Sequence, residues 1–207
     1  MTVFISGGCK NGKSYVAQRL AKSMRDGALN YGALYYVATM KSTGCEDDER
    51  IARHIREREG MGFVTVEQPT DIGGIAEKCD RGGAFLIDSL TALLANEMFP
   101  PDGSVDGLAA QRIIDGIARL VCIAGGVVFV SDYIYSDAYI YDEYTEKYRK
   151  SLAEIDRAAA AACDAVLEVV YSGIIVHKGY KKMECEKRFR EIFDGASFVA
   201  GDYETLY

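Results

Sequence analysis

The segment with the most definite chemistry begins at the seventh residue and fits the pattern G-x-x-x-x-G-K-S/T. Glycines let a backbone curl so that successive N–H groups face phosphate oxygens. In this pattern the lysine reaches the β- and γ-phosphates, and the hydroxyl that follows ligates Mg²⁺. We therefore predict that the whole segment binds a nucleoside triphosphate with Mg²⁺: Gly7, Gly8, Cys9, Lys10, Asn11, Gly12, Lys13 and Ser14.

The flanks of this segment supply the context that the pattern requires. Residues 2–6 are β-branched, aromatic or small and predict a buried strand. Val16, Leu20 and Met24 recur every fourth residue after the loop, which predicts a helix beginning near Lys13. The positive end of that helix would face the phosphates. A chance glycine-rich turn is the weaker interpretation.

A second candidate is one of the two histidines of the chain. Arg50, His54 and Arg58 are spaced i, i+4 and i+8, so on one helix they project as a line. The arginines would hold phosphate oxygens while the imidazole attacks the α-phosphorus. Spacing alone favours the other interpretation, a solvated basic stripe.

Two acids follow buried strands and compete for one role. Asp88 ends the apolar segment 84–88, and we predict that it holds Mg²⁺ together with Ser14. The alternative is that Asp88 only begins the next helix. Asp132 stands at the end of the segment 127–131 and is the weaker candidate.

The elements that would position these residues alternate along the chain. Strands are expected near residues 2–6, 33–39, 63–66, 84–88, 127–131, 165–171 and 174–177, with helices between most of them, and a short helix near 186–193. This alternation predicts a P-loop NTPase-like α/β fold, a mainly parallel sheet with helices on both faces. Ligands bind at the carboxyl ends of such strands. We divide the chain into a transferase domain, 1–178, and an extension, 179–207, packed on it.

Composition narrows the class of protein. The chain has 207 residues, 49% of them hydrophobic and 27% charged, with a net charge of −7. An acidic chain argues against a nucleic-acid partner. No apolar run approaches the roughly 18–20 residues of a membrane span, and we expect no leader before the first strand. Six scattered cysteines without a C-x-x-C pair suggest reduced thiols, so we expect a cytoplasmic protein.

Taken together, these segments of the sequence resemble the bifunctional adenosylcobinamide kinase / adenosylcobinamide-phosphate guanylyltransferase family of cobalamin biosynthesis. The resemblance includes the N-terminal phosphate loop, Tyr36 to Thr39, and Leu86 to Thr91. Its most specific part is Arg50 to Arg58, which fits R-I-x-x-H-x-x-x-R. It extends over roughly residues 3 to 176, through Ser172-Gly173-Ile174.

The resemblance implies an enzyme that uses GTP, ATP and Mg²⁺. It implies phosphoryl transfer to the hydroxyl of a corrinoid, adenosylcobinamide, followed by transfer of GMP to the resulting phosphate through a guanylyl group on His54. By the same resemblance Lys13 and Arg58 are catalytic, and Arg50 and Thr39 bind the nucleotide. Members of the family look trimeric, so a homo-oligomer is expected.

The sequence departs from the family pattern in two segments. Residues 132–139 lack the family's glycines and proline, and residues 148–157 keep only an arginine and an aromatic residue of its motif. Two alternatives therefore stay open. One is a P-loop phosphotransferase with another substrate, and the other is a GTP-binding regulatory protein without corrinoid chemistry.

Overall fold

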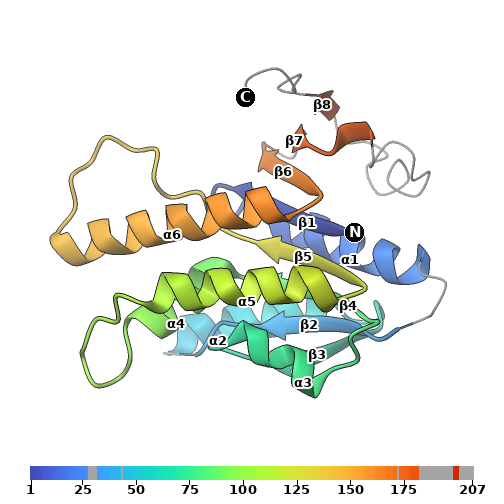
Figure 1. Cartoon of the computed structure of the whole chain (residues 1–207), viewed down its shortest axis with the longest axis horizontal. Coiled ribbons are helices and arrows are strands. Elements are labelled where there is room, and N and C mark those ends of the chain that lie inside the picture. Colours follow the sequence, from blue (N-terminus) through green and yellow to red (C-terminus); the bar gives the residue numbers. More distant parts are fainter. Residues whose placement is uncertain (28–31, 43, 172, 182–197, 201–207) are drawn as a thin grey trace.

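One twisted sheet organises the computed structural model, which describes residues 1–27, 32–42, 44–171, 173–181 and 198–200 (Figure 1). Its eight strands have the order β3-β2-β4-β5-β1-β6-β7-β8. The strands β1 to β6 are parallel, and β7 is antiparallel to β6. The bounds are β1 Thr2–Gly7, β2 Leu34–Ala38, β3 Phe63–Glu67, β4 Ala84–Asp88, β5 Gly126–Val130, β6 Ala165–Val170, β7 Gly173–Lys178 and β8 Phe198–Ala200.

Helices cover both faces of this sheet. α1 lies on one face, and α4, α5 and α6 pack together on the other (Figure 1). The helices are α1 Lys13–Gly27, α2 Cys45–Glu57, α3 Ile75–Lys78, α4 Leu90–Met98, α5 Ala109–Ile123 and α6 Glu143–Ala162, with a short 3₁₀ turn, η1 Ile72–Gly74. Among the described residues, none of these helices combines the length and apolarity that crossing a bilayer requires.

The central strands are buried on both sides, and this explains their continuous apolar sequences. Val3 and Ile5 of β1 pack with Leu20 of α1, whereas Phe4 packs into the core beneath α4, α5 and α6. A strand covered on both faces needs apolar side chains at every position rather than at alternate ones. The predicted mainly parallel sheet with helices on both faces is confirmed.

The strand order decides which acid lies near the phosphate loop. β5 is the direct neighbour of β1, and β4 is one strand further away. Neighbouring strands are about 4.8 Å apart, so Asp132 follows a strand adjacent to β1, whereas Asp88 ends one roughly 10 Å away. The helix expected near 186–193 lies outside the described residues.

Candidate active site

The loop between β1 and α1 has the backbone of a phosphate cradle. Gly7 and Gly12 adopt positive φ angles of 150° and 93°, and a Cβ on Gly7 would collide with Asn11 and with the carbonyl of Val169. Asn11 fixes the loop from within: its amide nitrogen donates to the Val169 carbonyl, and its oxygen accepts from the Lys13 backbone N–H at 3.2 Å. The loop is therefore tied to β6 before any ligand binds.

The Lys13 side chain is buried and surrounded by acceptors. Its Nζ atom donates to the Gly8 carbonyl at 2.6 Å and lies 2.8 Å from the Asp132 carboxylate. Only 6% of Lys13 is exposed. Asp132 was the weaker of the two candidate acids in the sequence, and it is the one that contacts the lysine.

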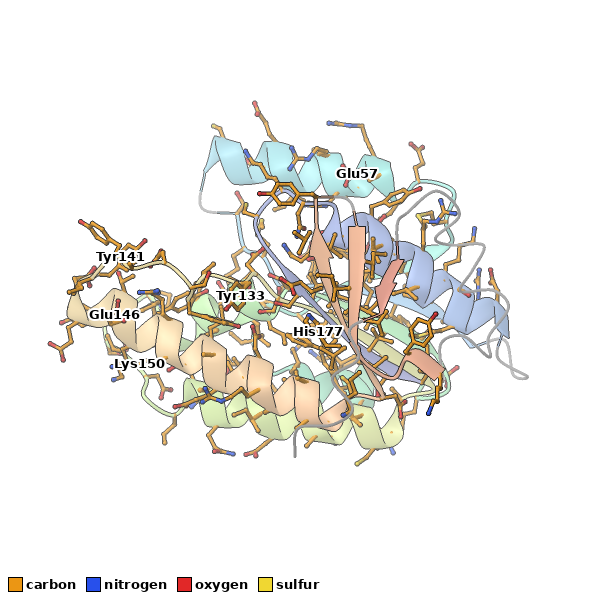
Figure 2. All side chains as sticks on the ribbon, turned by 90° about the horizontal axis from the view of Figure 1, so that it is seen from above. Glu57, Tyr133, Tyr141, Glu146, Lys150 and His177 are labelled. Carbon is orange, nitrogen blue, oxygen red and sulfur yellow. The ribbon has the colours of Figure 1, made fainter. Side chains whose placement is uncertain are left out.

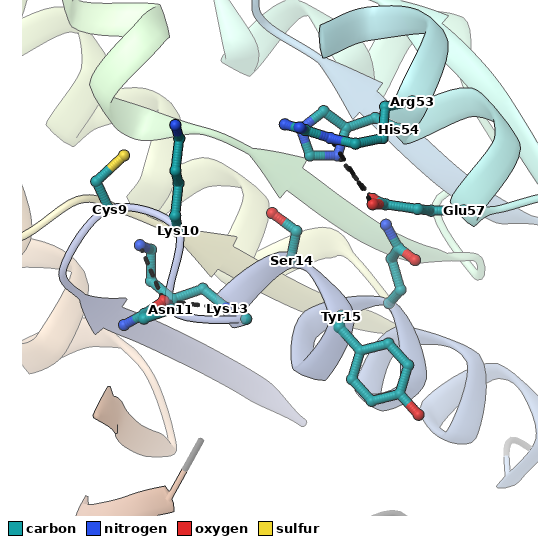
Figure 3. A pocket seen from close by; sticks show the side chains of 11 residues that line it. Cys9, Lys10, Asn11, Lys13, Ser14, Tyr15, Arg53, His54 and Glu57 are labelled. Carbon is teal, nitrogen blue, oxygen red and sulfur yellow. Dashed lines mark hydrogen bonds and ion pairs between the residues drawn. The ribbon is translucent and has the colours of Figure 1, made fainter. Parts of the chain in front are cut away.

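A cavity of about 480 Å³ separates this loop from α2 (Figure 3). The size suits a nucleotide-sized ligand, since small-molecule sites commonly occupy 300–1,000 Å³. Its walls come from the loop, from the first turns of α1 and from the last turn of α2. The lining residues are Cys9, Lys10, Asn11, Gly12, Lys13, Ser14, Tyr15, Gln18, Arg53, His54 and Glu57.

His54 faces the cavity from the wall opposite the phosphate loop (Figure 3). Its side chain is 18% exposed, and its Nδ1 atom is buried, 3.3 Å from a Glu57 carboxylate oxygen. The alignment of this pair falls short of a full hydrogen bond. Glu57 follows His54 by three residues on the same helix and also lines the cavity, so its carboxylate faces the Nδ1 side of the ring and leaves Nε2 on the other side.

Arg58 does not share this cavity. α2 ends at Glu57, and the Arg58 side chain turns back, donating to the His54 carbonyl at 2.9 Å and to the Thr65 hydroxyl at 3.3 Å. Its guanidinium lies 3.5 Å from the centre of the Tyr36 ring. The expected line of Arg50, His54 and Arg58 is therefore wrong at Arg58, because the helix stops one residue earlier.

Tyr36 links Arg58 to the predicted magnesium ligand. The Tyr36 hydroxyl donates to Asp88 at 2.9 Å. Burial, and then the Asp88 charge, raise the pKa of the Tyr36 hydroxyl, so it stays protonated as a donor. Arg58, Tyr36 and Asp88 thus form a continuous chain of contacts that orients the carboxylate at the end of β4.

Thr39 and Arg50 complete the residues predicted from the sequence. Thr39 is fully buried, and its hydroxyl accepts from the Ser89 N–H at 2.7 Å and donates to the Ser89 carbonyl at 2.8 Å. It therefore joins the ends of β2 and β4 and does not line the cavity. The side chain of Arg50 lies outside what the structure describes, so its role stays a prediction.

Four residues that line the cavity were not predicted from the sequence: Tyr15, Gln18, Arg53 and Glu57. Gln18 is only 2% exposed, and within the described structure its Nε2 atom has no hydrogen-bond partner, so this donor is available to a ligand. A signal existed for two of them. Gln18 lies four residues after Ser14, and Glu57 three after His54, so each shares a helix face with a predicted site residue.

A buried carboxylate on α6 lies within the electrostatic influence of Asp132. Asp156 of α6 is 6% exposed and accepts a hydrogen bond from the Tyr135 hydroxyl. Burial raises the pKa of Asp156 to about 6, the Asp132 charge adds to the rise, and the Tyr135 hydrogen bond opposes it. The protein therefore buries an ionised carboxylate at neutral pH at a cost in stability.

Asp156→Asn should stabilise the fold at pH 7 to 8. The folded pKa exceeds the unfolded value, so ionisation lowers the free energy of unfolding as pH rises from about 4 through 6. A shift of about two pKa units corresponds to roughly 3 kcal/mol, which is the upper limit of the gain. Urea unfolding of both proteins should give a stability difference that grows between pH 4 and 7. A constant difference would contradict the buried-charge explanation.

The fold and the loop together define the class of protein. A parallel sheet whose first strand passes through a glycine-rich loop into a helix, with acids at the ends of neighbouring strands, is the architecture of P-loop nucleotide-binding proteins.

Among solved structures, a KaiC-like protein from the archaeon Pyrococcus horikoshii is similar, with 12% sequence identity and a TM-score of 0.48, covering 86% of this chain and 78% of that one. The comparison with curated proteins found no match.

The family is defined by the sequence match. The model of the cobinamide kinase / cobinamide phosphate guanyltransferase family matches residues 3–177, most of the chain. The chain belongs to this family of transferases.

Proposed function

We propose that the chain phosphorylates adenosylcobinamide and then transfers GMP from GTP to the product through a guanylyl group on His54. The observation that carries this proposal is that one cavity has the phosphate loop on one wall and His54 on the other. A protein that only binds a nucleotide has no need of an imidazole facing its phosphates. The family match supplies the acceptor class.

The kinase step depends on positioning and on neutralising charge. The acceptor hydroxyl oxygen attacks the γ-phosphorus of ATP or GTP, the bond to the β–γ bridging oxygen breaks, and a nucleoside diphosphate leaves. Phosphate oxygens compete with Asp132 for the Lys13 ammonium, which now lies 2.8 Å from that carboxylate. Asp132, once released, is placed to accept the hydroxyl proton.

The donors around the loop fit Mg²⁺ bound largely by the nucleotide. Among the described residues, no group of three or more His, Cys, Asp or Glu side chains could cage a metal. Mg²⁺ usually takes one or two protein oxygens, several waters and the substrate phosphates. The Ser14 hydroxyl and the Asp88 carboxylate, held by Tyr36, are oxygens of that kind. When bound, the ion would neutralise charge on the β- and γ-phosphates.

The guanylyl step divides one displacement into two. The Nε2 atom of His54 attacks the α-phosphorus of GTP, a P–N bond forms, and the bond to pyrophosphate breaks. An oxygen of cobinamide phosphate then attacks the same phosphorus, the P–N bond breaks, and the imidazole is restored. Glu57 accepts a hydrogen bond from the Nδ1–H and stabilises the positive charge that develops on the ring.

Glu57→Gln should slow formation of the guanylyl adduct by about 10- to 100-fold, because the imidazole loses the carboxylate that orients it. Adduct formation is followed by single-turnover kinetics with GTP. The wild-type adduct should carry phosphorus on Nε2, which NMR of the labelled imidazole distinguishes from Nδ1.

Glu59→Gln is the matched control, since it removes the same charge from an exposed residue beyond the end of α2. It should leave the rate unchanged. An adduct on Nδ1, or equal rates for Glu57→Gln and wild type, would contradict the role of Glu57.

The proposed function is tested by following two labels with cobinamide as acceptor. Phosphate from [γ-³²P]GTP or [γ-³²P]ATP should appear in cobinamide phosphate, and label from [α-³²P]GTP should appear in a guanylylated corrinoid. Binding of GTP without transfer of either label would contradict the proposal. Transfer of the γ-label alone would reduce the protein to a kinase.

A further inference from the structure

The segment that follows β5 begins at the phosphate loop itself. Asp132 contacts Lys13, and the backbone N–H of Tyr133 donates to the Gly7 carbonyl at 3.0 Å. From there residues 133–144, here called the tyrosine arm, run outward along α6 (Figure 1). Figure 2 shows Tyr133 near the middle of the molecule and Tyr141 at the outer end of α6. The arm thus leads away from the point where the γ-phosphate would lie.

Arg149 holds the tyrosine arm in place from α6. This residue is only 8% exposed, and its guanidinium donates to the Ile134 carbonyl at 3.2 Å, to Asp137 at 2.9 Å and to Glu146 at 2.6 Å. It also lies 4.8 Å from the centre of the Tyr141 ring. A surface ordered before binding loses less conformational entropy when a ligand arrives.

The outer face of the tyrosine arm is aromatic and exposed. Five of the fourteen tyrosines of the chain lie between residues 133 and 144. Tyr133 is 46% exposed, Tyr139 69% and Tyr144 63%, and the neighbouring Ile140 is 87% exposed. The rings of Tyr139 and Tyr141 pack edge to face, with their centroids 4.7 Å apart. Exposed aromatic side chains gathered on one segment mark a binding site more often than an ordinary face of a protein.

We propose that the tyrosine arm receives the corrin ring of the acceptor, an inference that rests on the proposed function. The cobinamide named by the family has a large, conjugated macrocycle with apolar faces and an amide rim. Tyrosine rings offer flat apolar contact to such a face, and their hydroxyls offer hydrogen bonds to the amides. An acceptor lying along the arm would present its hydroxyl at the inner end, beside Tyr133 and the phosphate loop.

An exposed aromatic surface could also contact a second copy of this chain. The experiment below distinguishes this occupant from the corrinoid. Continuity with the phosphate site favours the corrinoid, because Tyr133 at the inner end of the arm is hydrogen-bonded to Gly7 of the phosphate loop. An interface between copies would need no such connection to the site of phosphoryl transfer.

The experiment measures cobinamide binding by isothermal titration calorimetry for wild type, Tyr139→Ala and Tyr144→Ala. Tyr171→Ala is the control, because this tyrosine is 98% exposed at the turn between β6 and β7, outside the arm. Each arm variant should raise the Kd for cobinamide about five- to tenfold, the loss of one aromatic contact. The Kd for GTP and the mass in light scattering should not change.

Three results would overturn the assignment. Unchanged cobinamide affinity in both arm variants would remove the arm from the acceptor site and leave the proposed function standing. A fall in oligomer mass without a change in cobinamide affinity would assign the arm to a second copy of the chain. A wild-type protein that binds GTP and no cobinamide would contradict the proposed function, and the arm assignment with it.

Discussion

His54→Ala should abolish transfer of GMP and preserve phosphorylation of cobinamide. The imidazole is the nucleophile of the guanylyl step alone, so its removal should lower that rate by at least about 10³-fold. The kinase step uses Lys13 and the loop, which His54 does not contact, and should stay within about twofold. The two rates are measured with α- and γ-labelled GTP in the same reaction mixture.

His177→Ala is the natural control, because the chain has only two histidines. His177 lies on β7 at 2.8 Å from Glu168, and it does not line the cavity. This variant should transfer GMP at the wild-type rate. Equal losses in the two variants, or a parallel loss of both activities in His54→Ala, would show that His54 is not a dedicated nucleophile.

Lys13→Ala should impair both activities, since one ammonium serves both the γ-phosphoryl and the pyrophosphate leaving group. We expect kcat to fall about 10²- to 10³-fold in each reaction, the usual effect of removing one charge-stabilising donor. The half-buried Asp132 carboxylate also loses its partner at 2.8 Å. Steady-state kinetics of both reactions give the result.

Lys22→Ala makes the same substitution on α1 outside the cavity and should be neutral. If Lys13→Ala changed only one reaction, the two transfers would use separate phosphate sites. Thermal unfolding of both variants shows whether a lost activity reflects lost structure.

The phosphate loop and the sheet were predictable because both are local in the sequence. Gly7, Gly12 and Lys13 are fixed by one short pattern, and buried strands such as β1 and β5 show as apolar runs. The loop and the strands need no knowledge of what packs against them. For His54, spacing alone favoured a solvated stripe, and only the family resemblance implied a role in the nucleotide site.

The remainder of the site depends on contacts between distant segments. Strand order places Asp132 beside Lys13, and nothing near either residue in the sequence reveals that order. The end of α2 at Glu57 sends Arg58 toward Tyr36, although periodicity alone extended the helix to it. The Thr39 hydroxyl is occupied by Ser89, fifty residues away. Tertiary packing decided each of these positions.

The central claim is a covalent guanylyl group on His54, and an intact-mass spectrum tests it most directly. Wild type and His54→Ala are incubated with GTP and Mg²⁺, without acceptor, and measured before and after mild acid. We predict an acid-labile increase equal to one GMP moiety in wild type, and none in the variant. A wild-type protein that binds GTP with no added mass, or a variant that still gains it, would contradict the claim.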